Sequence, residues 1–329
     1  MTDTVRKDIT FADRISNYKS AIIILTKIII AAGLLYYIIN SVNFSEIAFA
    51  IVDANIFLII PVLLLSFLNL YLQYYKWKLT ASLILNNSEN KKVIYSLFQG
   101  FSAAVFTPAR VGEYFGRALV FKDHSLLNVT VATLLDKFFP LLMVAFFGSI
   151  SSVLFIHYYY EVSLYITIGL FVVLFTLFYF IILLIFNQNF WDNILFNKLK
   201  DSKRFSKYFQ KFSTLKNLDR KYSTRMFLLS FLFYSCYIVQ YAILVSAFSH
   251  NTAIIDYIWA GNLTMFSKTL IPPVSFSELG IREGASVFFV QQFGESASVG
   301  FNASIFLFLI NVLLPALIGL ILIFRKNND

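Results

Sequence analysis

The sequence predicts an all-α, polytopic membrane protein, and three observations carry that prediction. Of the 329 residues, 58% are hydrophobic and only 14% are charged, whereas soluble domains carry about 25% charged residues. The apolar residues gather in runs close to the roughly 20 residues that a helix needs to cross a bilayer. Most lysines and arginines lie between these runs rather than inside them. We therefore expect a multi-pass protein of the cell inner membrane.

Six apolar runs are long enough to be full spans, at 21–40, 55–75, 128–156, 162–186, 226–248 and 301–324. Two further segments, 93–121 and 253–293, are apolar but interrupted. Proline and glycine mark these helix breaks, because proline removes a backbone donor and ends or kinks a helix. The break residues are Pro108, Gly112, Pro272, Pro273 and Gly280. Neither arm of the first segment is long enough to cross about 30 Å of hydrocarbon.

The basic residues predict which face of the membrane each connection meets. Twenty of the 27 lie in four segments, 1–20, 76–92, 187–225 and the residues after Phe324, and these should be cytoplasmic. Counting crossings then requires 93–121 to enter from the cytoplasm and return, and 253–293 to enter from the outside and return. The result is one transmembrane domain, 21–324, between cytoplasmic tails at 1–20 and 325–329.

The predicted order of elements is an inverted repeat. A span, a re-entrant hairpin and a span over 55–156 are mirrored by the same elements over 226–324, an arrangement common in secondary transporters. The connection 187–225 is basic and carries apolar residues on one helical face, which predicts an amphipathic helix lying on anionic lipid. Because topology accounts for the net charge of +9, we expect no nucleic-acid partner.

Ionisable residues within the apolar segments are the candidates for function, because charges at membrane depth are costly and usually face a cavity or a partner. Arginine can bind phosphate with two hydrogen bonds, and a helix N-terminus adds a positive dipole. The candidates for binding a substrate are Arg110, Arg117, Lys268 and Arg282. The candidates for balancing or gating that charge are Glu113, Asp136, Lys137, Glu278 and Glu283.

Spacing predicts how some of these charges pair. Glu113 and Arg117 are four residues apart, as are Glu278 and Arg282, so each pair can share a helix face. Cross-hairpin pairs, from Arg110 or Arg117 to Glu283 or Glu278, would then hold the two breaks together. Asp136 and Lys137 point about 100° apart on one helix, so we expect one to join the polar site and the other to pair elsewhere. A purely structural role for all these charges stays open.

The sequence offers no signal for catalysis, a cofactor or a metal. It contains no Walker-type phosphate loop, and its three histidines lack metal-ligand spacing. Its single cysteine, Cys236, lies in an apolar run and is interpreted as a packing residue. We expect no catalytic residues, no cofactor and no metal.

Both breaks resemble motifs of a known family. FTPARVGEYFGRALVF resembles the Pro-Gly-Arg-x-Gly-Glu stretch of the lysylphosphatidylglycerol synthase transmembrane (flippase-like) family, LGIREGA resembles its second Gly-x-Arg-Glu motif, and VATLLDKFFPLL resembles the span after the first motif. Ala109 departs from the family's glycine, and Pro272-Pro273 with Glu278 departs from its second pattern. The resemblance implies an all-helical domain that moves or binds phospholipid-type or polyprenyl-phosphate-type lipids. Bifunctional members continue into a soluble aminoacyl-transferase domain, whereas this sequence stops at Asp329, so we expect a stand-alone member.

Three functions are compatible with the sequence. The first is a lipid translocase, not an enzyme, that passes the headgroup of a phospholipid or polyprenyl-phosphate-linked lipid through a polar cavity between the hairpins. The alternative is a membrane-embedded subunit or enzyme of lipid or glycan modification acting on the same lipids. The third is a non-transporting assembly partner. The expected partner is a membrane lipid, anionic or sugar-linked; homo-oligomers and cell-envelope biosynthesis partners stay open.

Overall fold

The computed structural model describes residues 45, 49, 51–87, 89–105, 107, 110–186, 220–271 and 280–326, and this part of the chain contains helices and no strand. In chain order the elements are α3 (Ile56–Ile84), α4 (Asn90–Val105), α5 (Gly112–Ala118), α6 (Leu126–Tyr159), α7 (Leu164–Phe186), α11 (Arg220–Ser249), α12 (Ile254–Leu270), α13 (Ile281–Gln292), α14 (Ala297–Phe308), the π-helical η3 (Leu309–Leu313) and α15 (Leu314–Lys326). The all-α prediction is confirmed for these residues.

Five helical segments within the described ranges are long and apolar enough to cross a membrane. They are α3, α6, α7, α11 and the continuous α14–η3–α15 over Ala297–Leu322. Each corresponds to one of the predicted runs, although α3 continues to Ile84 rather than ending near 75, and α11 begins at Arg220 rather than near 226. The predicted span 21–40, the tail 1–20 and residues 187–219 of the amphipathic connection lie outside the described residues.

The surface of α7 shows why these helices need lipid around them. Thr167 and Phe178 are the buried residues of this 23-residue helix, while side chains such as Tyr165, Val173 and Leu177 are exposed. Its backbone bonds are satisfied within the helix, as hydrocarbon requires of any spanning segment. Soluble monomers rarely expose an apolar surface this extensive, so the chain is a multi-pass membrane protein.

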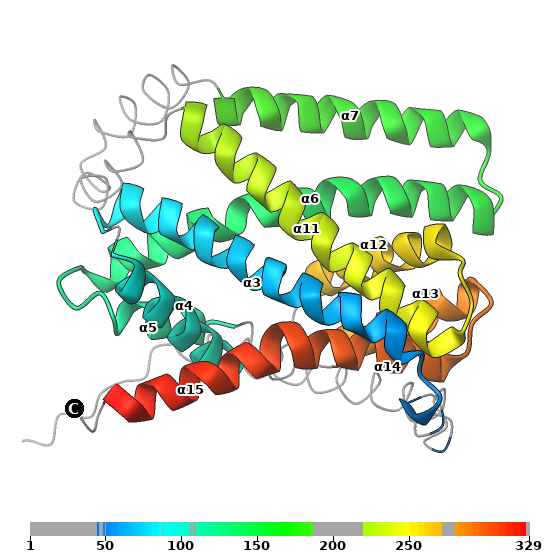
Figure 1. The fold of residues 1–329 in the computed structure, drawn as a ribbon. Helices are drawn as coiled ribbons and strands as arrows, with labels where there is room; N and C mark the ends of the chain where they lie inside the picture. Colours follow the sequence, from blue (N-terminus) through cyan, green and yellow to red (C-terminus); the bar gives the residue numbers. More distant parts are fainter. Residues whose placement is uncertain are drawn as a thin grey trace, which may run out of the picture.

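The two helical hairpins lie at opposite ends of the long helices. Figure 1 shows α4 and α5 near one end of the bundle and α12 and α13 near the other, with α3 and α11 crossing between them. α3 packs along α11, α4 packs against α15, and α12 packs against α6. The first helix of the first hairpin, α4, therefore packs on the last span. The first helix of the second hairpin, α12, packs on α6, the span that follows the first hairpin.

Glycines allow both of these contacts to be close. A side chain at Gly319 would collide with the carbonyl of Phe98, and one at Gly148 would collide with the ring of Phe266. Small residues at such positions let helices approach in a membrane, where packing rather than the hydrophobic effect holds them together. In both the α4–α15 and the α6–α12 interface, a glycine of the span thus faces a phenylalanine of the hairpin helix.

The spacing of these residues repeats between the two halves. Phe98 stands 14 residues before Gly112, and Phe266 stands 14 residues before Gly280. A serine cap then begins each closing span, Ser125 for α6 and Ser296 for α14, its oxygen accepting a backbone N–H three residues on. Gly148 and Gly319 each follow their capping serine by 23 residues. The two halves therefore share this spacing of phenylalanine, glycine and serine.

Candidate functional site

Glu113, near the start of α5, is the centre of a buried group of charges. Its carboxylate is 2% exposed and accepts a hydrogen bond from Arg117 Nη2 at 2.7 Å and one from Lys137 Nζ at 2.5 Å. Arg110 Nη2 lies 3.4 Å from the same carboxylate. One carboxylate thus contacts three cations.

Asp136, on α6, extends this group toward α3. It accepts a hydrogen bond from Arg117 Nη1 at 2.9 Å, and Lys76 Nζ lies 3.9 Å away. The guanidinium of Arg117 also stacks over the Trp77 ring, 4.1 Å from its centroid, a favourable cation–π geometry. Arg117 therefore joins the two carboxylates and is positioned by both.

We call these six residues, Lys76, Arg110, Glu113, Arg117, Asp136 and Lys137, the α5–α6 charge cluster. Its four cations face two carboxylates, which leaves a net charge of +2. The six residues, together with Gln73, Pro140 and Phe233, line a cavity of about 140 Å³. Within the described part of the chain, the cluster therefore carries more formal positive than negative charge.

The expectation that Asp136 and Lys137 could not both join the polar site is wrong. They do point in different directions, but Asp136 binds Arg117 and Lys137 binds Glu113. Arg117 in turn binds Glu113. The side chains of Arg117 and Lys137 are long enough to reach these carboxylates. Asp136 and Lys137 therefore belong to the same cluster although they point in different directions from α6.

Lys76 belongs to the cluster although its sequence position predicts otherwise. The end of the apolar run near residue 75 assigns it to a cytoplasmic connection, 76–92, but α3 continues to Ile84 and buries Lys76 to 4% exposure. A usable signal exists, because Trp77, Ala81 and Ile84 follow helical spacing and all are buried. The helical periodicity continues beyond the apolar run that defines the predicted span.

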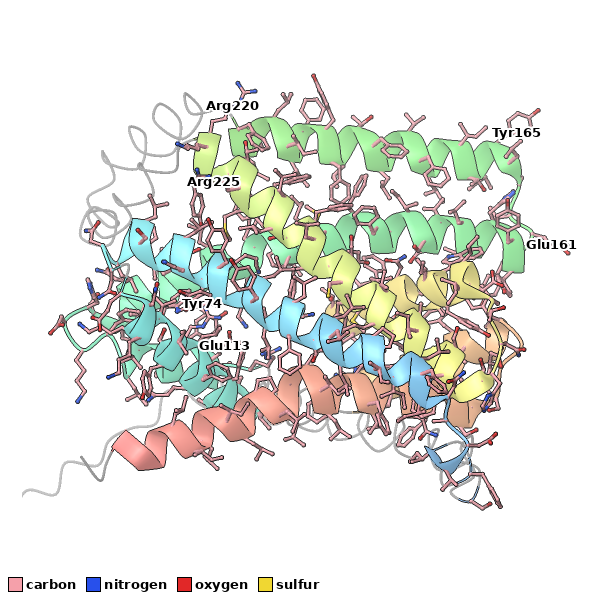
Figure 2. All side chains as sticks on the ribbon, in the orientation of Figure 1. Tyr74, Glu113, Glu161, Tyr165, Arg220 and Arg225 are labelled. Atoms are coloured by element: carbon pink, nitrogen blue, oxygen red, sulfur yellow. The ribbon has the colours of Figure 1, made fainter. Side chains whose placement is uncertain are left out.

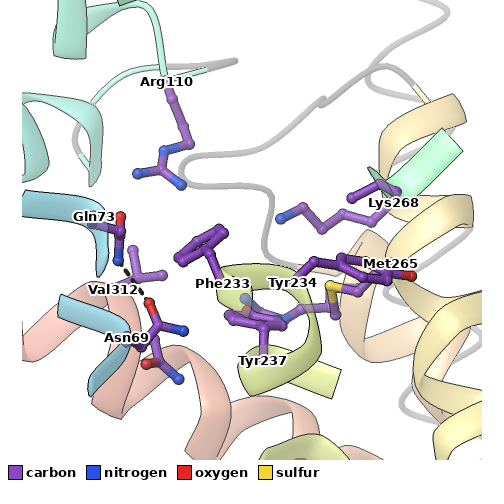
Figure 3. A pocket seen from close by; sticks show the side chains of 12 residues that line it. Asn69, Gln73, Arg110, Phe233, Tyr234, Tyr237, Met265, Lys268 and Val312 are labelled. Carbon is purple, nitrogen blue, oxygen red and sulfur yellow. Dashed lines mark hydrogen bonds between the residues drawn. The ribbon is translucent and has the colours of Figure 1, made fainter. Parts of the chain in front are cut away.

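A second cavity, of about 160 Å³, lies next to the first. Three of the four predicted substrate-binding residues line it: Arg110 from the first break, Lys268 near the end of α12 and Arg282 at the start of α13. Figure 3 shows Arg110 and Lys268 reaching into this space from different sides. The fourth candidate, Arg117, lines the smaller cavity, where it is held by Glu113 and Asp136.

The rest of the second cavity is made of amides and aromatic rings. Its other lining residues are Asn69, Gln73, Val144, Phe233, Tyr234, Tyr237, Met265, Asn311 and Val312. Gln73, Arg110 and Phe233 also line the first cavity, so the two spaces adjoin. Figure 3 places Phe233 between Arg110 and Tyr237. Among the described lining residues of this larger cavity there is no carboxylate.

Arg282 is fixed by its neighbours at the start of α13. It is 1% exposed, its Nε donates to Ser304 Oγ at 3.0 Å, and its Nη2 pairs with the Glu283 carboxylate. The same carboxylate accepts the Gly280 backbone N–H at 2.6 Å and so caps the helix. Gly280 has a φ of 93°, which glycine adopts without strain. Glu283 thus holds both the helix start and Arg282.

Both predicted glycine breaks mark helix starts. α5 begins at Gly112, where a side chain would collide with the carbonyl of Ala103. Gly280 caps α13. Pro108, Pro272 and Pro273, the other predicted break residues, and Glu278 lie outside the described residues.

The described ion pairs include no cross-hairpin pair, and Glu278, one of the two carboxylates predicted to form one, lies outside the described residues. Glu113 and Arg117 do pair four residues apart, while Glu283 pairs with the adjacent Arg282. Each hairpin therefore satisfies these carboxylates with residues of its own or of a neighbouring span. Figure 2 shows Glu113 inside the bundle, whereas Glu161, Tyr165 and Arg220 lie at its edges.

A family model described as "Lysylphosphatidylglycerol synthase TM region" matches residues 24–319. The matched region includes both cavities and the whole α5–α6 charge cluster. A search of curated proteins gives no match. In the described ranges no three His, Cys, Asp or Glu side chains gather as metal ligands would.

Proposed function

The chain belongs to the lysylphosphatidylglycerol synthase TM-region family, and from this premise we propose that it is a lipid translocase. In this proposal the headgroup of a phospholipid or a polyprenyl-phosphate-linked lipid enters the two adjoining cavities, while its hydrocarbon chains stay in the bilayer. The observation that carries the proposal is the convergence of Arg110, Lys268 and Arg282 on one cavity from the ends of two broken helices.

The charge of the cavities supports an anionic headgroup. Moving a phosphate away from water is costly unless cations and hydrogen-bond donors replace its hydration. Arg110, Lys268 and Arg282 supply such groups in the larger cavity, and the α5–α6 charge cluster adds a net +2 beside it. In this mechanism Glu113, Asp136 and Glu283 balance the charge of the arginines and orient them. Phe233 lines both cavities.

For the topology we propose six spans and two re-entrant hairpins arranged as an inverted repeat, with both termini in the cytoplasm. At 1.5 Å per residue, the 16 residues of α4 and 17 residues of α12 reach about 24–26 Å, less than the roughly 30 Å of hydrocarbon. The repeated spacing of Phe98, Gly112 and Gly148 and of Phe266, Gly280 and Gly319 supports the repeat. Broken helices that meet at a central site are a feature of such transporters.

A flipping assay in proteoliposomes tests the proposal. A fluorescent anionic phospholipid is placed in both leaflets, and its accessibility to an impermeant quencher is followed with time. We expect the wild type to flip the lipid and the Arg110→Gln, Lys268→Gln double variant to flip it about tenfold more slowly or worse, because each charged hydrogen bond contributes about 1.5–3 kcal/mol. Lys221→Gln with Arg225→Gln, two exposed residues of α11, is the matched control and should keep the wild-type rate.

Two results would overturn the proposal. One is a wild type that flips neither an anionic phospholipid nor a polyprenyl-phosphate lipid above the rate of empty vesicles. The other is an unchanged rate in the double variant. Incubation of the purified protein with radiolabelled lipid distinguishes the rival function, since an enzyme of lipid or glycan modification would convert the lipid to a new species and a translocase would return it unchanged.

A further inference from the structure

Within the described part of the chain, two buried amides of the larger cavity have polar atoms without hydrogen-bond partners. Asn69, on α3, is fully buried; its Oδ1 accepts from Gln73 Nε2 at 2.9 Å, but its Nδ2 has no hydrogen-bond partner within the described part of the chain. Asn311, in η3, is 5% exposed; its Nδ2 donates to Gln240, but its Oδ1 has no partner there. One free donor and one free acceptor thus line the same cavity.

Such atoms are unusual and call for an explanation. More than about 90% of buried polar groups are hydrogen-bonded, and an unsatisfied one costs about 1–3 kcal/mol. Asn311 also lies in a π-helical turn, Leu309–Leu313, within an otherwise α-helical span. Single π-helical turns occur frequently at functional sites. The π-helical turn and the unpaired amide oxygen of Asn311 therefore lie together at the cavity. Val312, from the same turn, also lines it.

A hydroxyl group is the chemical group that matches this pair, because it can accept from Asn69 Nδ2 and donate to Asn311 Oδ1. Tyr237 and Phe233 border the same space, and Figure 3 shows Asn69 facing it below Gln73. Aromatic rings offer an apolar surface to the C–H groups of a glycerol or a sugar. The three cations of the same lining would hold the adjoining phosphate.

We propose that the cavity selects lipids whose phosphodiester carries an uncharged polyol headgroup, with Asn69 and Asn311 binding its hydroxyls and Arg110, Lys268 and Arg282 binding its phosphate. The inference rests on the translocase function proposed above and specifies its substrate. A glycerol headgroup on a phospholipid and a hexose on a polyprenyl phosphate share this chemistry.

The decisive experiment compares lipids that differ only in headgroup hydroxyls. In the first arm, proteoliposomes receive fluorescent phosphatidylglycerol or phosphatidylmethanol, which carry the same charge. In the second arm, they receive a polyprenyl phosphohexose or the polyprenyl methyl phosphate. We expect the wild type to flip the hydroxylated lipid of at least one arm about fivefold to tenfold faster than its partner, as the loss of one or two hydrogen bonds predicts. The arm that discriminates identifies the lipid.

Variants assign the preference to the two amides. Asn69→Leu and Asn311→Leu should reduce the ratio to near one without slowing the methyl lipid. Asn69→Asp keeps the shape and the acceptor for Gln73 but removes the free donor, so it should reduce the ratio even if the leucine variants fold poorly. Asn302→Leu, a buried amide that lines neither cavity, is the control and should keep the wild-type ratio.

The outcomes separate this inference from the function on which it rests. If the wild type flips all four lipids and neither pair differs, the cavity amides bind only water and the inference is wrong, while the translocase function stands. A ratio that survives in Asn69→Asp and in both leucine variants also overturns it. If no lipid is flipped, the translocase proposal fails and this inference fails with it.

Discussion

Replacing Glu113 by glutamine removes a carboxylate that Arg110, Arg117 and Lys137 share. The change keeps the size and shape of the side chain and raises the net charge of the α5–α6 cluster from +2 to +3. Glu113 is 2% exposed and Arg117 is equally buried, so little water can replace the lost interactions. The variant therefore isolates the electrostatic role of one buried group.

The structure sets the expected size of the effect. Removing one partner of a buried ion pair typically destabilises a protein by about 3–5 kcal/mol. Here Lys137 is 35% and Arg110 is 22% exposed in their side chains, so solvent reduces the penalty for those two cations. Arg117 keeps its bond to Asp136. We therefore expect a loss near the lower limit, about 3 kcal/mol in the free energy of unfolding.

The chain contains a convenient reporter for this measurement. Cys236 is its single cysteine and is buried, with its thiol against the Leu65 carbonyl. A maleimide dye that fluoresces on reaction with thiols reports unfolding as detergent-solubilised protein is heated. From the usual relation between stability and melting temperature, Glu113→Gln should lower the melting temperature by roughly 5 °C or more.

A double-mutant cycle and a matched control complete the test. Adding Lys137→Met to Glu113→Gln restores the net charge of +2 and should recover about 1–2 kcal/mol, the coupling expected between contacting charges. Glu89→Gln removes a carboxylate that pairs with Lys92 at 3.4 Å but is 53% exposed, so it should change stability by less than about 0.5 kcal/mol. Equal melting temperatures for Glu113→Gln and Glu89→Gln, with no recovery in the double variant, would refute the electrostatic reasoning.

Two further predictions concern packing and topology. Gly319→Leu and Gly148→Leu should each destabilise the protein by about 1–3 kcal/mol, because each new side chain collides with the neighbouring helix. Gly169→Leu is the control and should not destabilise it, because the space around Gly169 is open. Similar melting temperatures for all three variants would exclude tight packing at Gly319 and Gly148. In a Cys236→Ser background, an impermeant maleimide should label Glu89→Cys and Asp123→Cys from the cytoplasmic face and Asn251→Cys and Gln292→Cys from the outer face. Labelling of Glu89→Cys and Asp123→Cys from opposite faces would show that the first hairpin crosses the membrane, and the same result for the other two positions would show it for the second.

The elements that could be predicted from the sequence are those that depend on local composition. Run length identified α3, α6, α7, α11 and the last span, and the Pro-Gly segments located the interruptions between α4 and α5 and between α12 and α13. Among the described candidates, the presence of charge within apolar sequence singled out every residue of the α5–α6 cluster except Lys76. Burying a charge in a membrane protein needs a reason, so position alone was informative.

What could not be predicted depends on contacts between distant residues. Lys76 looked like a loop lysine because average hydropathy falls after residue 75, although the buried face of α3 continues to Ile84. The shared cluster of Asp136 and Lys137 depends on how far Arg117 and Lys137 extend. Asn69 and Asn311 resemble ordinary helix-packing residues in sequence, and their unpaired atoms emerge only from the complete hydrogen-bond pattern.

The π-helical turn at Leu309–Leu313 also fixes the rotational register of the last span. Before the turn, Ser304 faces the hairpin that contains Arg282, and after it Gly319 faces Phe98 on the other hairpin. Deleting a single residue such as Val312 and restoring an uninterrupted α-helix would rotate one of these faces by about 100° relative to the other. The last helix could then dock correctly on either hairpin, but not on both. The π-helical turn therefore allows one continuous helix to present the correct face to each of the two hairpins.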